Sequence, residues 1–377
     1  MPYITIKQHQ KPYQITFEDA LFGTIPVNSF FGESSATGTI TRKVDNIGEN
    51  VLNQIRVPEM IEWLETFNER HKDLFEADRN SLYSHFKIPK KTGGLRQIDA
   101  PCDELQNALR ELVVFLKDTC GCLYHTAAFA YVEKRSTIDC VRKHVEFKSQ
   151  WYLKTDISGF FPSTTLEFTM KMLSMIFPLS EIVKVEQGKE ALEKAISLGF
   201  LNGGLPQGTV LSPFLTNVMF IPIDHYLFGE FSSRKMVYTR YADDMHISAQ
   251  EKFPYEKMVE IIKEAFRMFG APYEIKEEKT HFGSYKGKNW LLGVVANSDF
   301  NITVGYRNKA RMKGCINNFI LDTLNNNPWD ITDVMHMTGL LSYYKMVEKD
   351  YFETIIRRAE NKYHVNFNNM VKIYLNA

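Results

Sequence analysis

The sequence predicts an α+β fold, because strand-like and helix-like patterns both recur along it. Apolar and polar residues alternate over 235–241 and again over 245–248, which is typical of two strands joined by a tight turn. A third β-rich apolar run covers Trp151–Asp156 and ends before Gly159 and Pro162. Helical spacing of apolar residues marks 103–119, 136–147, 163–176, 187–199, 213–228 and 253–269, a stretch from Pro58, and three stretches after Arg307.

Two adjacent carboxylates, Asp243 and Asp244, fall at the turn of the predicted hairpin. Like charges side by side repel each other, and a bound divalent cation removes that cost; hard oxygen ligands of this kind suit Mg²⁺. Asp156 falls at the end of the third strand, and two-metal phosphoryl transfer needs carboxylates from separate elements that converge on one site. The alternatives are a solvated acidic turn for the pair and, for Asp156, a cap for the helix that begins near Pro162.

A glycine-rich stretch, Gly203–Gly208, lies between these carboxylates in the sequence. Its glycines let the backbone approach a flat ligand closely. Pro213 suits the first turn of the helix that follows, with Ser212 as its N-cap. Taken alone, the stretch favours an ordinary glycine-rich loop before an amphipathic helix.

These segments together carry a resemblance. Asp156 with Phe160-Phe161, Leu205–Gly208 with Ser212-Pro213 and Asn217, and Tyr241–Asp244 occur in the order and approximate spacing of reverse transcriptase palm motifs. The chain therefore resembles a prokaryotic reverse transcriptase of the group II intron, retron and defence-associated lineage, over about residues 80 to 365. The resemblance implies a right-hand polymerase with fingers, a palm of antiparallel sheet plus helices, and a helical thumb.

Four further segments support the resemblance. Ile88–Pro101 is similar to the fingers hairpin that grips a triphosphate, and Glu277–Thr280 to the segment whose lysine assists pyrophosphate departure. Trp290–Val295 is similar to a primer grip, and Gly339–Tyr344 to a retron-type thumb. The implied division is 1–80 as an N-terminal extension of unknown role, 81–150 as fingers, 151–295 as palm with primer grip and some inserted fingers elements, and 296–377 as thumb.

The resemblance also implies a metal site and its chemistry. Asp156, Asp243 and Asp244, with Ile157 beside them, are expected to bind Mg²⁺, for which Mn²⁺ can substitute. The three carboxylates and Lys279 are expected to be catalytic, with Lys279 protonating the leaving group. The alternative for Lys279 is a surface charge in an acidic segment.

Nucleotide and nucleic-acid contacts follow from the same resemblance. Phe161 lies five residues after Asp156 and is expected to exclude a 2′-hydroxyl; the alternative is a core aromatic. The residues expected to contact the incoming dNTP are Lys90, Lys91, Arg96, Phe160, Phe161, Gln207, Gly208 and Tyr241. Those expected to contact nucleic acid are Trp290, Leu292, Gly293, Lys286, Lys288, Arg307, Lys309 and Arg311.

Composition narrows the class of protein. Apolar residues make up 44% and charged residues 24% of 377 residues, as in an ordinary globular chain of two or three subdomains. Five cysteines, an odd number without zinc spacing, indicate reduced structural thiols. No apolar run is long enough to span a bilayer, and no signal core follows the N-terminus. These features predict a cytoplasmic protein without a membrane partner.

Charge is balanced overall but locally basic. The chain has 45 basic and 45 acidic residues, which argues against tight binding to arbitrary nucleic acid. From Lys279 to Lys313, however, seven basic residues stand against Asp299 alone. Sequence-independent affinity comes chiefly from such phosphate contacts. A specific RNA partner is therefore expected to meet this strip.

The sequence departs from retron enzymes at two points. Arg135–His144 lacks the Asn-Ala pair that usually precedes the His, and Leu291–Gly293 lacks a Thr. The favoured function is thus a free-standing, defence-associated reverse transcriptase that copies an RNA template, expected to be a noncoding RNA, into DNA. It could act as a homo-oligomer or with an accessory defence protein. The alternatives are a template-independent or protein-primed DNA polymerase of abortive-infection type, and a catalytically silent RNA-binding scaffold.

Overall fold

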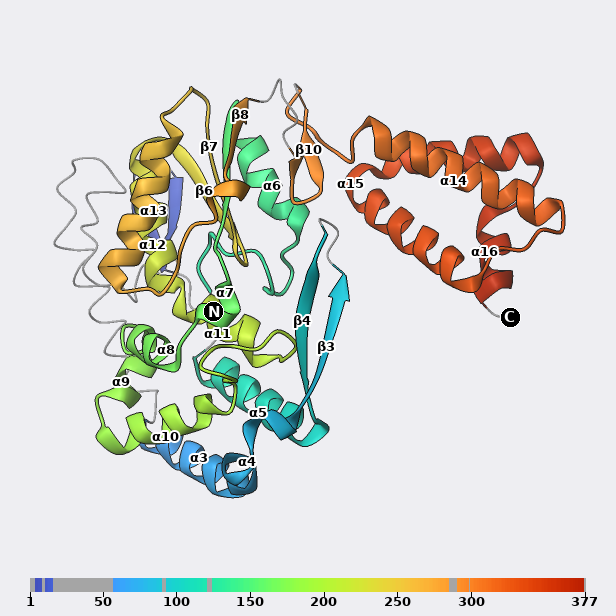
Figure 1. Cartoon of the computed structure of the whole chain (residues 1–377). Coiled ribbons are helices and arrows are strands. Elements are labelled where there is room, and N and C mark those ends of the chain that lie inside the picture. Colours follow the sequence, from blue (N-terminus) through green and yellow to red (C-terminus); the bar gives the residue numbers. More distant parts are fainter. Residues whose placement is uncertain are drawn as a thin grey trace. The chain divides into compact units, whose positions relative to one another are not determined.

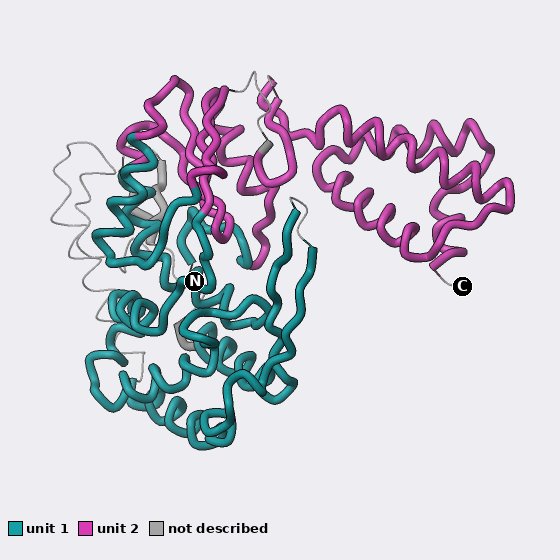
Figure 2. The backbone as a smooth tube through the Cα atoms, in the orientation of Figure 1, with its two compact units in different colours: residues 1–132, 157–230, 257–276 teal, residues 133–156, 231–256, 277–377 magenta. Residues whose placement is uncertain are grey.

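The computed structural model describes residues 4–8, 11–15, 57–89, 93–120, 124–284, 290–297 and 299–375 (Figure 1). Helices and strands alternate along the chain, so the α+β prediction is confirmed. Two compact units are present (Figure 2). Unit 1 comprises the described residues of Met1–Val132, Ile157–Glu230 and Lys257–Lys276. Unit 2 comprises those of Glu133–Asp156, Phe231–Glu256 and Glu277–Ala377.

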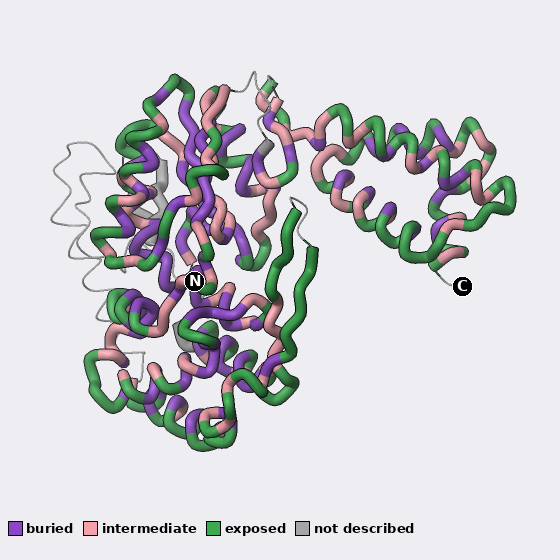
Figure 3. Tube along the Cα trace, viewed as in Figure 1, coloured by how far each residue is buried: buried purple, intermediate pink, exposed green. Residues whose placement is uncertain are grey.

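Unit 1 is mainly helical and has its own apolar core. Buried leucine, isoleucine and phenylalanine side chains from helices far apart in the sequence meet there, among them Leu64, Phe67, Leu109 and Ile196. Figure 3 shows buried positions, in purple, along the helices of this unit. Its helices are α3 (Val57–Arg70), α4 (Lys72–Glu76), α5 (Asp103–Cys120), α7 (Phe160–Ser163), α8 (Leu166–Leu173), α9 (Leu179–Val183), α10 (Glu186–Ser197), α11 (Leu211–Met219), and most of α12 (Ile221–Ser233) and α13 (Tyr255–Phe269). A short 3₁₀ turn, η2 (Arg79–Leu82), precedes its hairpin.

The stripe predicted from Pro58 onward forms the buried face of α3, which includes Ile61, Leu64 and Phe67. Glycine permits the tight packing of α10 on this helix. A Cβ added at Gly188 would lie 2.6 Å from the carbonyl oxygen of Ile182 and 2.9 Å from Ile61 Cδ1. Any larger residue at 188 would therefore push α10 away from the core.

Two antiparallel hairpins also belong to unit 1. One joins β1 (Ile4–Gln8) to β2 (Lys11–Ile15). The other joins β3 (Tyr83–Pro89) to β4 (Leu95–Pro101), with Ile88 opposite Arg96. Gly93 and Gly94 both have positive φ, which suits the turn end of this ribbon. The predicted ribbon around the Gly-Gly pair is confirmed, whereas Lys90 and Lys91 lie outside the described residues.

Unit 2 contains a four-stranded antiparallel sheet in the order β6-β7-β5-β8. The strands are β5 (Trp151–Asp156), β6 (Met236–Tyr241), β7 (Asp244–Ala249) and β8 (His281–Ser284), and the 3₁₀ turn η3 (Glu277–Lys279) leads into β8. The predicted hairpin and the predicted third strand are both confirmed, and they pair with each other. Helix α6 (Thr137–Glu146) begins with a capping box in which Ser136 and Asp139 bond each other's backbone amides.

The rest of unit 2 is a small sheet followed by a helical bundle. The sheet has the order β11-β10-β9, from β9 (Trp290–Leu291), β10 (Val294–Ala296) and β11 (Ile302–Thr303). The bundle consists of α14 (Tyr306–Leu324), α15 (Ile331–Tyr363) and α16 (Phe367–Leu375), so the three helical stretches predicted after Arg307 are confirmed. Its core includes Phe319, Leu341 and Phe352. Helix α15 is interrupted at Glu348, whose φ of −140° and ψ of 66° are not helical.

Two local predictions were wrong. The predicted helix over 213–228 is divided into α11 and α12, because Pro222 has no N–H to continue the hydrogen-bond ladder at this point. Ser212 is not an N-cap: α11 begins at Leu211, and Val210 is its N-cap. The Ser212 hydroxyl instead donates to the carbonyl oxygen of Pro206 at 2.8 Å and closes the loop that precedes the helix.

Within the part of the chain that the structure describes, none of the helices combines the length and apolar content needed to cross a bilayer. The three cysteines described with their side chains, Cys102, Cys140 and Cys315, are free thiols. The reduced state expected from the sequence therefore holds for these three.

Candidate catalytic site

The carboxylates of Asp156, Asp243 and Asp244 gather at one end of the four-stranded sheet. Asp156 is the last residue of β5 and Asp244 the first of β7, and the two stand directly opposite each other in the antiparallel register. Paired residues of this kind have Cβ atoms about 4.5–5.5 Å apart on the same face. Asp243 lies in the connecting turn, one residue before Asp244. Residues 88 positions apart thus form one acidic cluster.

Burial and mutual repulsion govern the charge of this cluster. The pKa of Asp244 is raised to about 6, first by burial and then by the negative charges of Asp243 and Asp156. Lys154 and Lys279 act in the opposite direction. A carboxylate held this close to two others is less costly to keep ionised when a cation is present.

Lys279 supplies one such positive charge. Its Nζ donates to Asp156 Oδ2 at 2.8 Å, and its side chain is 51% exposed whereas that of Asp156 is 8% exposed. Burial alone would lower the pKa of Lys279, but the hydrogen bond to Asp156 and the charges of all three carboxylates raise it overall. The lysine is therefore a protonated partner of the cluster.

The donor chemistry of the cluster fits a hard divalent cation, since all three side chains offer carboxylate oxygens. With the side chains as they stand, no group of three His, Cys, Asp or Glu residues among those described is arranged to hold a metal ion. The Lys279 ammonium donates a hydrogen bond to one oxygen of Asp156, so this oxygen is already engaged by the lysine. Carboxylates turn easily about their side-chain bonds, and the negative charges that crowd around Asp244 favour a cation beside it. Ile157, which follows Asp156, is buried and bridges Ile275.

In unit 1, the two expected nucleotide-binding phenylalanines differ in environment. Phe160 is only 5% exposed, and its ring lies 5.4 Å from Phe220 and 5.3 Å from Tyr273, centroid to centroid. Phe161 is half-buried at the edge of the unit 1 core. Its carbonyl oxygen accepts a hydrogen bond from the Leu205 amide at 3.0 Å. Phe161 is therefore the more accessible of the pair.

The glycine-rich loop packs against other backbone segments of unit 1. A Cβ added at Gly208 would lie 2.5 Å from the Asp99 carbonyl oxygen, and one at Gly204 would lie 2.1 Å from that of Pro162. The Gln207 carbonyl oxygen accepts a hydrogen bond from the Asp99 amide at 2.8 Å. These glycines thus permit contact between the loop, α7 and β4, the strand that carries the exposed Arg96.

The expected primer-grip residues form a turn between β9 and β10. Leu292 and Gly293 both have positive φ, 51° and 86°. The neighbouring Leu291 and Val294 are buried in a cluster that also includes Tyr343 of α15. Tyr241, on β6, is half-buried. Its pKa is raised, first by burial and then by electrostatic interaction with Cys140 and Tyr343. Lys286 and Lys288 lie outside the described residues, as does the side chain of Trp290.

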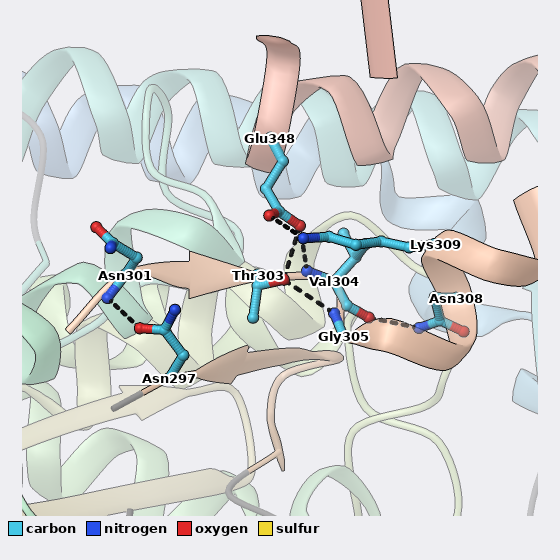
Figure 4. Close-up of polar contacts among 8 residues, drawn as sticks. All are labelled: Asn297, Asn301, Thr303, Val304, Gly305, Asn308, Lys309 and Glu348. Atoms are coloured by element: carbon cyan, nitrogen blue, oxygen red, sulfur yellow. Dashed lines mark hydrogen bonds and ion pairs between the residues drawn. The ribbon is translucent and has the colours of Figure 1, made fainter. Parts of the chain in front are cut away.

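Of the basic strip on α14, Arg307, Arg311 and Lys313 are exposed, whereas Lys309 is engaged within the protein. Lys309 Nζ lies 2.5 Å from Glu348 Oε1, and Lys309 is only 21% exposed (Figure 4). Glu348 Oε2 also accepts hydrogen bonds from the Thr303 hydroxyl and the Val304 amide. The interruption in α15 therefore places Glu348 where it ties the start of α14 to the middle of α15.

A buried polar network behind the sheet was not predicted from the sequence. His144 on α6 hydrogen-bonds Ser248 Oγ through Nδ1 at 2.6 Å and Thr239 Oγ1 through Nε2 at 2.8 Å. It thereby joins β6 and β7, the two strands of the hairpin that carries Asp243. Burial lowers the pKa of His144 to about 3. The sequence signals only a histidine in a helix, since its partners lie 95 and 104 residues away.

Comparison with known proteins gives consistent results. A family model described as reverse transcriptase (RNA-dependent DNA polymerase) matches residues 88–302, more than half of the chain. Three curated relatives are 26% identical to the chain. Two are the Retron Ec83 and Ec73 reverse transcriptases of Escherichia coli; the matches cover 78% and 76% of this chain, respectively, and 90% of each relative. The third is the Retron Mx65 reverse transcriptase of Myxococcus xanthus, whose match covers 75% of this chain and 65% of the relative.

Proposed function

We propose that this chain, which belongs to the reverse transcriptase (RNA-dependent DNA polymerase) family, joins deoxynucleotides by two-metal nucleotidyl transfer at Asp156, Asp243 and Asp244. It is an RNA-directed DNA polymerase of retron type, with the right-hand polymerase fold. The observation that carries the mechanism is the opposition of Asp156 and Asp244 across two paired strands, with Asp243 beside them. We further propose that 81–150 act as fingers, 151–295 as palm and 296–377 as thumb.

The three carboxylates, with Ile157 next to them, would hold Mg²⁺ or Mn²⁺. Bound there, such ions would supply the positive charge that activates the attacking hydroxyl and stabilises the leaving oxygen. Two paired strands of one sheet and the turn beside them carry these three residues, so the sheet fixes the spacing of their backbones while the carboxylates can turn. We propose that Lys279 balances their charge and gives a proton to the departing pyrophosphate; its raised pKa keeps the ammonium protonated before the reaction.

For the incoming nucleotide, we propose that Phe161 rather than Phe160 tests the 2′ position of the sugar. Phe160 is held inside an aromatic cluster, and only Phe161 has an accessible edge. Arg96 on the exposed ribbon offers a fork suited to phosphate. Lys90, Lys91, Gln207, Gly208 and Tyr241 keep the nucleotide-binding roles that the family implies.

We also propose that the template is a noncoding RNA and that the enzyme serves antiviral defence. The retron names of the curated relatives, and the balanced overall charge, support a dedicated RNA rather than any RNA. On α14, Arg307, Arg311 and Lys313 are the described basic residues of the strip that remain exposed for such an RNA. A cytoplasmic location, an oligomer and an accessory protein stay predictions.

The deciding experiment is primer extension on an RNA template with Asp243→Asn, measured together with Mn²⁺ binding by electron paramagnetic resonance. The variant keeps its size but loses a charge, so it should lose both incorporation and tight Mn²⁺ binding. Glu251 is exposed and lies beyond the other end of β7. Glu251→Gln removes one negative charge in the same way and should change neither incorporation nor Mn²⁺ binding. Incorporation by a folded Asp243→Asn at the wild-type rate would refute the assignment.

A further inference from the structure

Arg240 is the largest fully buried side chain among the described residues, with no exposed surface. Burying a guanidinium is costly unless its charge and donors are engaged. One of its donors, Nη1, bonds the carbonyl oxygen of Ala242 at 3.2 Å. Ala242 lies in the turn beside Asp243, so this hydrogen bond joins the buried guanidinium to the turn of the hairpin.

Arg240 approaches that turn from the face opposite the acidic cluster. In the register of β6 and β7, Arg240 pairs with Met245, whereas Tyr241 pairs with Asp244. Successive strand residues point to opposite faces, so Arg240 and Asp244 project on different sides of the sheet. Arg240 therefore supports the turn from the face opposite the acidic cluster, away from the proposed substrate site.

The turn needs such support because of its conformation. Ala242 has a φ of 58°, in the left-handed region that an L-residue with a Cβ adopts at a cost. Gly and Asn adopt this region more readily, but neither stands at position 242. A hydrogen bond to the Ala242 carbonyl oxygen offsets this cost, since it forms only while the peptide keeps this orientation.

The same peptide carries the amide nitrogen of Asp243. A peptide group is planar, so fixing the Ala242 oxygen also fixes the plane from which Asp243 starts. We propose that Arg240 is a positioning residue that sets the direction of the Asp243 carboxylate through the Ala242 peptide. This inference rests on the proposed role of Asp243, and it adds a residue that never touches the nucleotide.

The test is a double-mutant cycle between Arg240→Lys and Ala242→Asn. Lysine keeps a positive charge but loses the planar fork. In the otherwise unchanged chain, Arg240→Lys should lower kcat about tenfold or more, because it misplaces the Asp243 carboxylate. The KM for dNTP should change less than about twofold. Mn²⁺ affinity, measured by electron paramagnetic resonance without nucleotide, should fall in parallel.

Asparagine at the turn makes the left-handed conformation easier without help from position 240. In the Ala242→Asn background, Arg240→Lys should therefore cost less than about threefold, a coupling that double-mutant cycles resolve. A guanidinium that only fills the interior would show the same loss in both backgrounds, and that result would overturn the proposal. So would wild-type kcat and Mn²⁺ affinity for Arg240→Lys itself.

A second arm leaves the buried charge in place, in case Arg240→Lys fails to fold. Ala242→Val resists positive φ, because its branched side chain crowds the backbone. It should lower kcat and Mn²⁺ affinity with little change in KM; unchanged values would also overturn the proposal. If instead Asp243→Asn binds Mn²⁺ like the wild type, the proposed function fails first. If Asp243→Asn loses Mn²⁺ and the cycle shows no coupling, only the role of Arg240 fails.

Discussion

Lys279 donates to Asp156 across 2.8 Å, so a carboxylate proposed to hold a divalent cation already has a positively charged partner. The lysine side chain is half exposed and the aspartate almost completely buried, which leaves the lysine free to move while Asp156 stays fixed. If Asp156 holds a metal ion as proposed, the ammonium and the ion would compete for the same oxygen before nucleotide enters. A bound triphosphate would then offer the lysine a second anionic partner.

Lys279→Met should therefore change two measurements in opposite directions. Two unit charges 4 Å apart in water interact by about 1 kcal/mol, so Mn²⁺ affinity without nucleotide should rise about fivefold. The rate of dNTP incorporation should fall by about 10²-fold or more, if Lys279 gives the proton to pyrophosphate. Lys257→Met, on the exposed face of α13, removes the same charge and should leave both values unchanged. A fall in both affinity and rate would show that Lys279 only maintains the local structure.

Phe161→Ala should increase the use of ribonucleotides relative to deoxynucleotides, because it opens the space beside the sugar. A single steric change in a pocket is worth roughly tenfold or more in discrimination. Competition between rNTP and dNTP in primer extension measures the effect. Phe160→Leu is the matched control: it should cost about 1 kcal/mol of stability through repacking and leave discrimination unchanged. The opposite pattern would assign the 2′ position to Phe160.

Replacing Arg307 and Arg311 with Gln should flatten the salt dependence of RNA binding. Each phosphate neutralised contributes about 0.7–0.9 to the log–log slope, so the pair should remove about 1.5 units. Lys309→Gln should flatten it less, because Lys309 is paired with Glu348, and should instead lower the melting temperature of the protein. Binding measured at several salt concentrations separates the two effects. Slopes unchanged from the wild type in both variants would indicate that α14 does not contact phosphate.

Acid should destabilise the fold through His144. Its folded pKa of about 3 lies below the ordinary value of 6.5, so between these pH values the unfolded chain binds a proton that the folded chain does not. Stability is therefore complete above pH 6.5 and is lost as pH falls through this window. The contribution of His144 amounts to about 2 kcal/mol between pH 7 and pH 5.

Urea unfolding at the two pH values measures this loss. His144→Gln should reduce the loss of unfolding free energy between pH 7 and pH 5 by about 2 kcal/mol. His281→Gln, at an exposed position on β8, should not. The pKa of the buried His246 is also lowered, by burial and by His144 and Lys154, so part of the pH dependence should persist in His144→Gln. An unchanged pH dependence in His144→Gln would place the titrating group elsewhere.

Local patterns predicted the elements that carry the site. The alternation around Tyr241–Asp244 predicted a hairpin, and the run Trp151–Asp156 predicted a strand, because strand periodicity and turn residues act over a few neighbours. Errors arose where a distant or competing partner decided. Ser212 has the chemistry of an N-cap, yet its hydroxyl bonds Pro206 and the helix begins one residue earlier.

The sequence by itself determined the α+β class, the strand end at Asp156, the turn at Asp243 and the helices after Arg307. Only the tertiary structure decided that Lys309 faces Glu348, that His144 joins Thr239 to Ser248, and that Arg240 is fully buried. Secondary structure follows from backbone preferences and side-chain period within one segment. The partner of a buried or charged group depends on which segments meet in the folded chain, and residues far apart in sequence carry no local signal of that meeting.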